Sequence, residues 1–337
     1  MPNIAESEYF FTSSEGKTPI HVREWTPDCD LNGVVQISHG INEYIGRYEH
    51  FARYLASKGF VVVGNDHLGH GQSVLSPDRL GFFAEQDGWF HVVDDVEELR
   101  RRTHEKYTDI PYFVLGHSMG SFVVRTWLSR CPQSKVSGVI LSGTGQPPAP
   151  VVAAGRLACD ADMLKNGPMH RSQKIYDLAF GAYNKGIEPL RTTYDWLTRD
   201  EAVVDKYAAD PLCTFIPTSS LFRDMMFGLG LLSRSDTVNR MRTDTPIILM
   251  SGDRDPVGGN GMQVARIYRD YVRAGFEDVA YKFYDGARHE ILNETNKDEV
   301  YQDILDWLFT KIDRERRIAS VVCSSVNYEN KEKATAK

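Results

Sequence analysis

The sequence lacks long apolar runs, an excess of basic charge and closely spaced cysteines. Its longest aliphatic runs are as short as Val61-Val62-Val63, whereas a bilayer-spanning helix needs about 20 apolar residues. We therefore do not expect the chain to be an integral membrane protein. With 39 Lys and Arg against 46 Asp and Glu, the net charge is −7, and no basic run is available to displace counterions from a polyanion. We expect no nucleic-acid partner.

A metal centre and a disulfide framework are also disfavoured. The five cysteines are an odd number at unrelated spacings, and the ten histidines form no H-E-x-x-H pattern, so free thiols in a reducing compartment are expected and no metal. The first residues, Met1 to Glu8, lack the basic flank and apolar stretch of a secretory signal. We expect a cytoplasmic protein, at most peripheral at membranes.

What the sequence does have is an alternation of strand-like and helix-like segments over 337 residues, 42% of them hydrophobic. Two strands at 8–12 and 20–25 predict a hairpin. Further strands are predicted at 33–38, 60–64, 112–115 and 136–141, and helices between them at 47–57, 95–103 and 121–129. This order predicts an α/β fold with a mostly parallel central sheet and helices on both faces.

The alternation stops in the middle of the chain. Residues 145–244 contain helical stretches without strand runs and are interpreted as an inserted helical cap, or lid. The pattern resumes with strands at 246–250 and 279–284, a helix at 262–274, and a last helix with Val300, Ile304, Leu308 and Ile312 on one face. The catalytic domain is then 1–144 and 245–313, and residues 314–337 are expected to form a polar, flexible tail.

The segment Gly116-His117-Ser118-Met119-Gly120 lies between a predicted strand and a predicted helix. In this context G-x-S-x-G is typical of a strained turn that exposes the serine hydroxyl, and only small neighbours permit it. A glycine-rich turn with a capping serine is the alternative. Because a serine hydroxyl is a weak nucleophile, it needs a base that a third group orients. Ser118 is the candidate nucleophile.

Two later strands end at groups that can activate this serine. The last strand runs into His289, and the strand before it runs into a loop with Asp253 and Asp255. We assign His289 as the base, with a surface loop histidine as the alternative. We prefer Asp255 as its partner because Pro256 fixes the chain after it, whereas Asp253 is placed to cap a turn.

An oxyanion hole needs two backbone N–H groups. The first is expected from Met119, the residue after the nucleophile, and the second from Ile41, because Gly40 allows a close backbone approach. His39 is interpreted as a structural hydrogen-bonding residue. Glu43 either fixes this loop by accepting hydrogen bonds or is a solvated surface carboxylate.

Taken together, these motifs resemble the monoacylglycerol lipase and lysophospholipase branch of the α/β-hydrolase family, over about residues 8 to 312. The similarity rests on His39 to Glu43 with Gly46-Arg47-Tyr48, Asn65 to Ser73, Gly116 to Gly120, Gly252 to Val257 and Ala287 to Glu290, and bacterial members also share 195–201 and 209–213. The resemblance implies cofactor-free hydrolysis of carboxylic esters by Ser118, Asp255 and His289, with Ile41 and Met119 as the oxyanion hole. It also supports Asp255 over Asp253.

The substrate is expected to be a single-chain lipid ester such as a monoacylglycerol or a lysophospholipid. Phe222, Met225, Met226 and Leu229 stand at i, i+3, i+4 and i+7, so an acyl chain could lie on this stripe, although packing as ordinary core fits it equally. Transient membrane or micelle contact through the cap remains open. The alternatives are a short-chain carboxylesterase, an amidase or peptidase on the same fold, and a catalytically silent binding module.

Overall fold

A central sheet of eight strands organises the chain. The computed structural model describes the backbone of residues 2–335 and the side chains of residues 2–317. The strand order is β1-β2-β4-β3-β5-β6-β7-β8, and the strands are β1 (Ile4–Thr12), β2 (Pro19–Pro27), β3 (Gly33–Ser38), β4 (Phe60–Asn65), β5 (Tyr112–His117), β6 (Gly138–Ser142), β7 (Ile247–Gly252) and β8 (Val279–Tyr284). The β1–β2 and β2–β4 pairings are antiparallel, and the five other pairings of this sheet are parallel. The predicted, mostly parallel sheet is confirmed.

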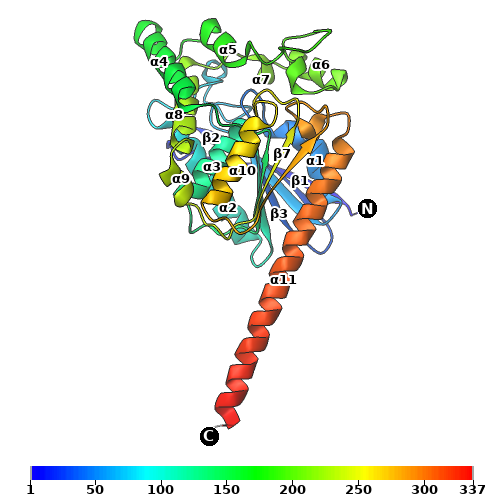
Figure 1. Cartoon of the computed structure of the whole chain (residues 1–337). Coiled ribbons are helices and arrows are strands. Elements are labelled where there is room, and N and C mark those ends of the chain that lie inside the picture. The colour runs from blue at the N-terminus through cyan, green and yellow to red at the C-terminus, as the bar shows by residue number, and fades with distance from the viewer. Residues whose placement is uncertain (1, 336–337) are drawn as a thin grey trace.

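Helices cover both faces of this sheet (Figure 1). One apolar cluster joins the sheet to α1 (Glu49–Ala56) and α11 (Lys297–Thr335), and the other joins it to α2 (Gly88–Lys106), α3 (Met119–Arg130) and α10 (Met262–Arg273). The predicted apolar stripe of the last helix is confirmed, because its four members are all buried against the sheet. Short 3-10 turns occur at Ile45–Tyr48, Pro77–Arg79 and Ile291–Asn293.

Between β6 and β7 the chain forms helices only, and we refer to residues 145–244 as the cap. The cap contains α4 (Ala149–Asn166), α5 (Gln173–Phe180), a 3-10 turn (Asp195–Leu197), α6 (Glu201–Ala209), α7 (Pro211–Thr214), α8 (Ser219–Leu232) and α9 (Ser235–Asn239). Figure 1 shows α4, α5 and α6 gathered over one end of the sheet. The loops after β5, β7 and β8 open at this end, so the residues that they carry face the cap.

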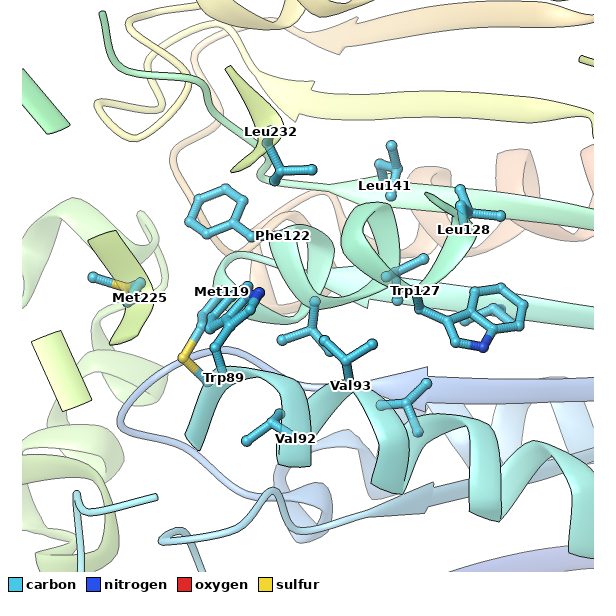
Figure 2. Close-up of a cluster of buried hydrophobic side chains, with 14 of the residues drawn as sticks. Trp89, Val92, Val93, Met119, Phe122, Trp127, Leu128, Leu141, Met225 and Leu232 are labelled. Atoms are coloured by element: carbon cyan, nitrogen blue, oxygen red, sulfur yellow. The ribbon is translucent and has the colours of Figure 1, made fainter. Parts of the chain in front are cut away.

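Helix α8 packs against α2 and α3 in one of the two apolar clusters that cover the sheet. Gly228 lets it approach α2 closely, since a Cβ at this position would lie 2.1 Å from the Trp89 ring. Figure 2 shows Met225 and Leu232 of α8 in the same buried cluster as Trp89 and Phe122. The predicted apolar stripe of α8 therefore exists and is used for packing.

The chain end differs from the expected boundary at Arg314. Helix α11 is continuous from Lys297 to Thr335, and its second half extends away from the domain in Figure 1. The flexibility expected for residues 314–337 stays a prediction, and the side chains from residue 318 onward lie outside the described residues. No helix in the described part of the chain is long and apolar enough to cross a membrane.

Candidate active site

Ser118 stands in a strained turn between β5 and α3. Its backbone adopts φ 51° and ψ −123°, a region that residues other than glycine rarely occupy. Gly120 makes the turn feasible, because a Cβ there would lie 2.0 Å from the carbonyl oxygen of Ser38. A Cβ at Gly116 would likewise lie 2.8 Å from the carbonyl oxygen of Gly120. Both positions of the motif therefore require glycine, because a larger side chain would clash there, as the sequence predicts.

His289 and Asp255 are joined by a buried hydrogen bond of 3.0 Å between Nδ1 and Oδ1. The Asp255 carboxylate also accepts hydrogen bonds from the Val257 N–H at 2.9 Å and the Ser251 hydroxyl at 3.3 Å. Burial opposes the charged imidazolium, but the negative charge of Asp255 outweighs it and raises the pKa of His289. Nδ1 is therefore the protonated nitrogen of the neutral ring, and Nε2 keeps its lone pair.

Asp253 has a different role. Its Oδ1 accepts a hydrogen bond of 2.8 Å from the backbone N–H of Gly286, which ties the loop after β7 to the loop after β8. The structure thus agrees with the interpretation of Asp253 as a turn-capping residue and pairs Asp255 with the histidine.

His117 is a second imidazole next to His289, with ring centroids 4.7 Å apart. Its Nδ1 lies 3.3 Å from the Ser142 hydroxyl. Burial, together with repulsion from His289, lowers the pKa of His117 to about 3. It stays neutral in the physiological range, and no carboxylate among the described residues is hydrogen-bonded to it, so it is a weaker candidate base than His289.

The loop after β3 lies directly against the turn of Ser118, since a Cβ at Gly40 would be 3.0 Å from the serine Cβ. His39 holds this loop: its Nδ1 donates to the Gly40 carbonyl at 2.7 Å, and its Nε2 accepts from the His67 N–H at 2.8 Å. The structural interpretation of His39 is confirmed. Within residues 2–317 the N–H groups of Ile41 and Met119 donate to no protein acceptor, so both are available to a ligand.

A buried ionic network connects this loop to His289. Glu43 accepts hydrogen bonds from the Gly40 N–H, from Tyr48 at 2.8 Å and from Arg47 at 2.9 Å. Arg47 also makes two hydrogen bonds with Glu290, at 2.7 and 2.8 Å. Burial opposes ionisation of Glu290, but the guanidinium outweighs it and lowers the pKa of this carboxyl to about 2. Of the two interpretations of Glu43, the loop-fixing acceptor is right.

A pocket opens at Ser118 and His289. Its wall on the cap side is aromatic, with the Trp196 ring 5.0 Å from the His289 ring and near-parallel to Phe180. The cap residues that line the pocket are Tyr176, Phe180, Tyr194, Trp196, Leu197 and Tyr207. The sequence analysis missed all six, although the density of aromatic residues between 176 and 207 was a usable signal.

The expected substrate contacts in α8 need correction. Phe222, Met225, Met226 and Leu229 are not among the residues that line the pocket. Three of them are buried in the core, and Met226 packs against it and towards α4. Because α8 is enclosed between α2 and α3 on one side and α4 on the other, its stripe satisfies core packing, which was the alternative interpretation.

Comparison with known proteins gives consistent matches. The sequence model of the family described as "Serine aminopeptidase, S33" matches residues 30–296. The monoacylglycerol lipase of Mycolicibacterium smegmatis is 29% identical over 315 residues, which cover 93% of this chain and 100% of that protein. Human monoglyceride lipase is 28% identical, with 85% of each chain covered. A carboxyl esterase structure from Bacillus coagulans matches with a TM-score of 0.84 and 29% identity, over 91% of this chain and 99% of that one.

Proposed function

Since the chain belongs to the α/β-hydrolase family described as serine aminopeptidase, S33, we propose that it hydrolyses single-chain lipid esters through a serine nucleophile and releases the fatty acid. Monoacylglycerols and lysophospholipids are the proposed substrates. The observation that carries this proposal is the strained turn of Ser118 in the same pocket as the hydrogen-bonded His289 and Asp255. The named lipases and the esterase among its relatives support ester hydrolysis.

In the first half-reaction, the Ser118 hydroxyl attacks the ester carbonyl carbon while Nε2 of His289 takes the hydroxyl proton. Asp255 holds the ring in the required tautomer and stabilises the imidazolium. The carbonyl oxygen becomes an oxyanion, which the N–H groups of Ile41 and Met119 stabilise. When the carbon–oxygen bond to the alcohol breaks, His289 returns the proton to the departing alcohol, and the acyl group remains on Ser118.

The second half-reaction repeats this chemistry with water. His289 takes a proton from a water molecule, whose oxygen attacks the acyl carbon in the same oxyanion site. The bond to Ser118 then breaks, the serine oxygen recovers a proton from His289, and the fatty acid leaves. No metal or organic cofactor enters either step.

An aminopeptidase is the second candidate, because the family description names one. Such an enzyme needs a carboxylate to bind the α-ammonium group of its substrate. The two carboxylates that line the pocket belong to Glu43 and Glu290, and both are already paired with Arg47. The aromatic wall suits an acyl chain, so this pocket favours a lipid ester over a peptide N-terminus.

We also propose that the cap touches lipid surfaces transiently, as a peripheral protein on the cytoplasmic side would. Val151, Leu157 and Leu164 on α4 and Leu178 on α5 are all more than half exposed. Leu157 and Leu164 stand seven positions apart on α4, so they share one helix face. This face suits shallow insertion among lipid headgroups and is too small for stable anchoring.

Vesicle sedimentation tests the proposed lipid contact. Leu157→Ser combined with Leu164→Ser is expected to reduce the fraction bound to phosphatidylcholine vesicles. The control is Leu75→Ser, which removes an exposed leucine outside the cap and is expected to leave binding as in the parent. Equal binding of the double variant and the control would refute the cap as the contact surface.

A fluorophosphonate probe tests the proposed chemistry directly. We expect labelling of Ser118, located by peptide mass, and protection by long-chain monoacylglycerols or lysophospholipids. p-Nitrophenyl esters of increasing chain length, beside an aminoacyl amide, separate a lipid esterase from a short-chain esterase and from a peptidase. A folded protein that the probe does not label would favour the catalytically silent binding module.

A further inference from the structure

Asn42 follows Ile41 in the loop that lies against Ser118, and it has an unusual backbone and an unusual side chain. Its φ is 57°, in the left-handed region that favours glycine and that asparagine tolerates best among the other residues. The residue is 95% buried and lines the pocket that contains Ser118. It therefore belongs to the pocket wall at the proposed oxyanion loop.

The amide of Asn42 is fixed in orientation. Its Nδ2 donates a hydrogen bond of 2.6 Å to the carbonyl oxygen of Phe215, between α7 and α8 of the cap. Since only the nitrogen end of the amide can donate, this bond directs Oδ1 away from that carbonyl. Within the described residues Oδ1 is buried and has no hydrogen-bond partner. A buried acceptor without a donor is destabilising, so a ligand that supplies the donor is bound preferentially.

Three other polar side chains of the pocket wall are already engaged. Glu43 and Glu290 are paired with Arg47, and His117 is bonded to Ser142. Asn65 Oδ1, His67 Nδ1 and His70 Nε2 are also buried without partners, but these residues do not line the pocket. Within the described residues, Asn42 Oδ1 is thus the one buried polar side-chain atom of this pocket wall without a hydrogen-bond partner.

We propose that Oδ1 of Asn42 accepts a hydrogen bond from a free hydroxyl of the substrate's alcohol, and that this bond selects glycerol-type esters over simple alkyl esters. The inference rests on the proposed ester hydrolysis and names the part of the substrate that the pocket recognises. The position fits this role, because Asn42 adjoins Ile41, whose N–H faces the ester oxygen in the proposed mechanism. A site built to bind a hydroxyl discriminates against the analogue that lacks it.

The test compares two esters of one acyl chain, 1-lauroylglycerol and propyl laurate, as a ratio of their kcat/KM values. The ratio cancels losses of folded enzyme that affect both esters equally. Wild type is expected to prefer the glycerol ester. Asn42→Gly suits the positive φ and removes the acceptor, so the preference is expected to fall about five- to tenfold. Asn42→Asp keeps an oxygen acceptor but loses the donor to Phe215 that orients it, so its preference is expected to lie between those of Asn42→Gly and wild type.

Asn65→Ser is the matched control, since it removes an unpaired buried amide oxygen that lies outside the pocket wall. Its ratio of kcat/KM values for the two esters is expected to equal that of wild type. An unchanged preference in Asn42→Gly overturns the inference, and so does a preference in Asn42→Asp as low as that in Asn42→Gly. If the glycine variant does not fold, an Asn42→Asp protein that has lost all preference for the glycerol ester overturns the inference. Equal turnover of both esters by wild type also overturns it but leaves ester hydrolysis intact. If wild type turns over neither ester nor any p-nitrophenyl ester, the proposed function itself fails.

Discussion

Arg47 binds Glu290 through two parallel hydrogen bonds, Nη1 to Oε1 at 2.7 Å and Nη2 to Oε2 at 2.8 Å. Glu290 directly follows His289, and Arg47 also binds Glu43, which holds the N–H of Gly40. One guanidinium therefore links the loop of the proposed oxyanion hole to the loop of the proposed base. It also lies 4.8 Å from the ring centre of Tyr207 in the cap, so three parts of the pocket meet at this side chain.

Arg47→Met is expected to destabilise the protein strongly. The substitution leaves the carboxylates of Glu43 and Glu290 buried without a cation, and breaking a buried pair in this way costs about 3–5 kcal/mol. Urea unfolding should show this loss in the free energy of unfolding. Combining Arg47→Met with Glu290→Gln should recover part of it, because one uncompensated charge is removed. A single variant as stable as wild type would contradict the central role of Arg47.

Ser118→Ala is expected to abolish ester hydrolysis while the fold is kept. The hydroxyl is the proposed nucleophile, and removing the serine of a complete triad costs about a millionfold in kcat. The measurement is kcat on a p-nitrophenyl ester, with circular dichroism and the unfolding midpoint as checks on the fold. Ser14→Ala, at an exposed hydroxyl far from the pocket, is the matched control with expected wild-type turnover. Wild-type turnover in a folded Ser118→Ala protein would assign the nucleophile elsewhere.

The tight packing of the turn around Ser118 predicts that a larger side chain at Gly120 is not tolerated. A Cβ at Gly120 would lie 2.0 Å from the Ser38 oxygen and 2.4 Å from the His39 oxygen. Gly120→Ala must therefore displace α3 from the loop after β3, and both stability and kcat should fall. Gly230→Ala is the control, because a Cβ in this helical position of α8 meets only Val152 at 3.9 Å and should stabilise by up to about 1 kcal/mol. Thermal unfolding of both variants checks the contrast, and equal effects would contradict it.

Much of the fold was predictable because the local patterns are strong. The strands at 33–38 and 279–284 have the predicted bounds, since each is a short β-rich run between turn residues. Helix α2 begins at Gly88 rather than at the predicted Asp95. Its first turns bury Trp89, Val92 and Val93 against α3 and α8, and that burial becomes visible only when the helices are assembled.

Some residues of the candidate site could be predicted from the sequence, and the residues of the pocket wall could not. Ser118, Asp255 and His289 could be predicted because each follows a strand, and parallel strands bring such positions to one edge of the sheet. The pocket wall was not found, since irregular cap segments carry Tyr176, Trp196 and the other aromatic residues and no periodicity marks them. The stripe of α8 had clear periodicity, but amphipathic spacing does not tell which neighbour a helix packs against.

The pH dependence of activity should report the pairing of His289 with Asp255. Burial lowers the pKa of His289, but attraction to Asp255, Glu290 and Glu43 raises it above the ordinary value of 6.5. Since the base must be neutral, kcat/KM should decline as the pH falls through this raised pKa, with a midpoint above 6.5. The same pair contributes stability that is fully present below pH 6.5 and is lost as the pH rises through the raised pKa.

Asp255→Asn should move the acidic limb of that profile to lower pH, because the amide removes the main attraction and leaves the lowering effect of burial. The value of kcat should also fall by about 10⁴-fold, since an asparagine favours the wrong tautomer of His289. The pH profile of kcat/KM for one p-nitrophenyl ester measures both effects. Asp253→Asn is the matched control: it lies two residues away, binds the Gly286 N–H and should leave the midpoint in place. If Asp253→Asn shifts the midpoint and Asp255→Asn does not, the two carboxylates have been assigned the wrong way round.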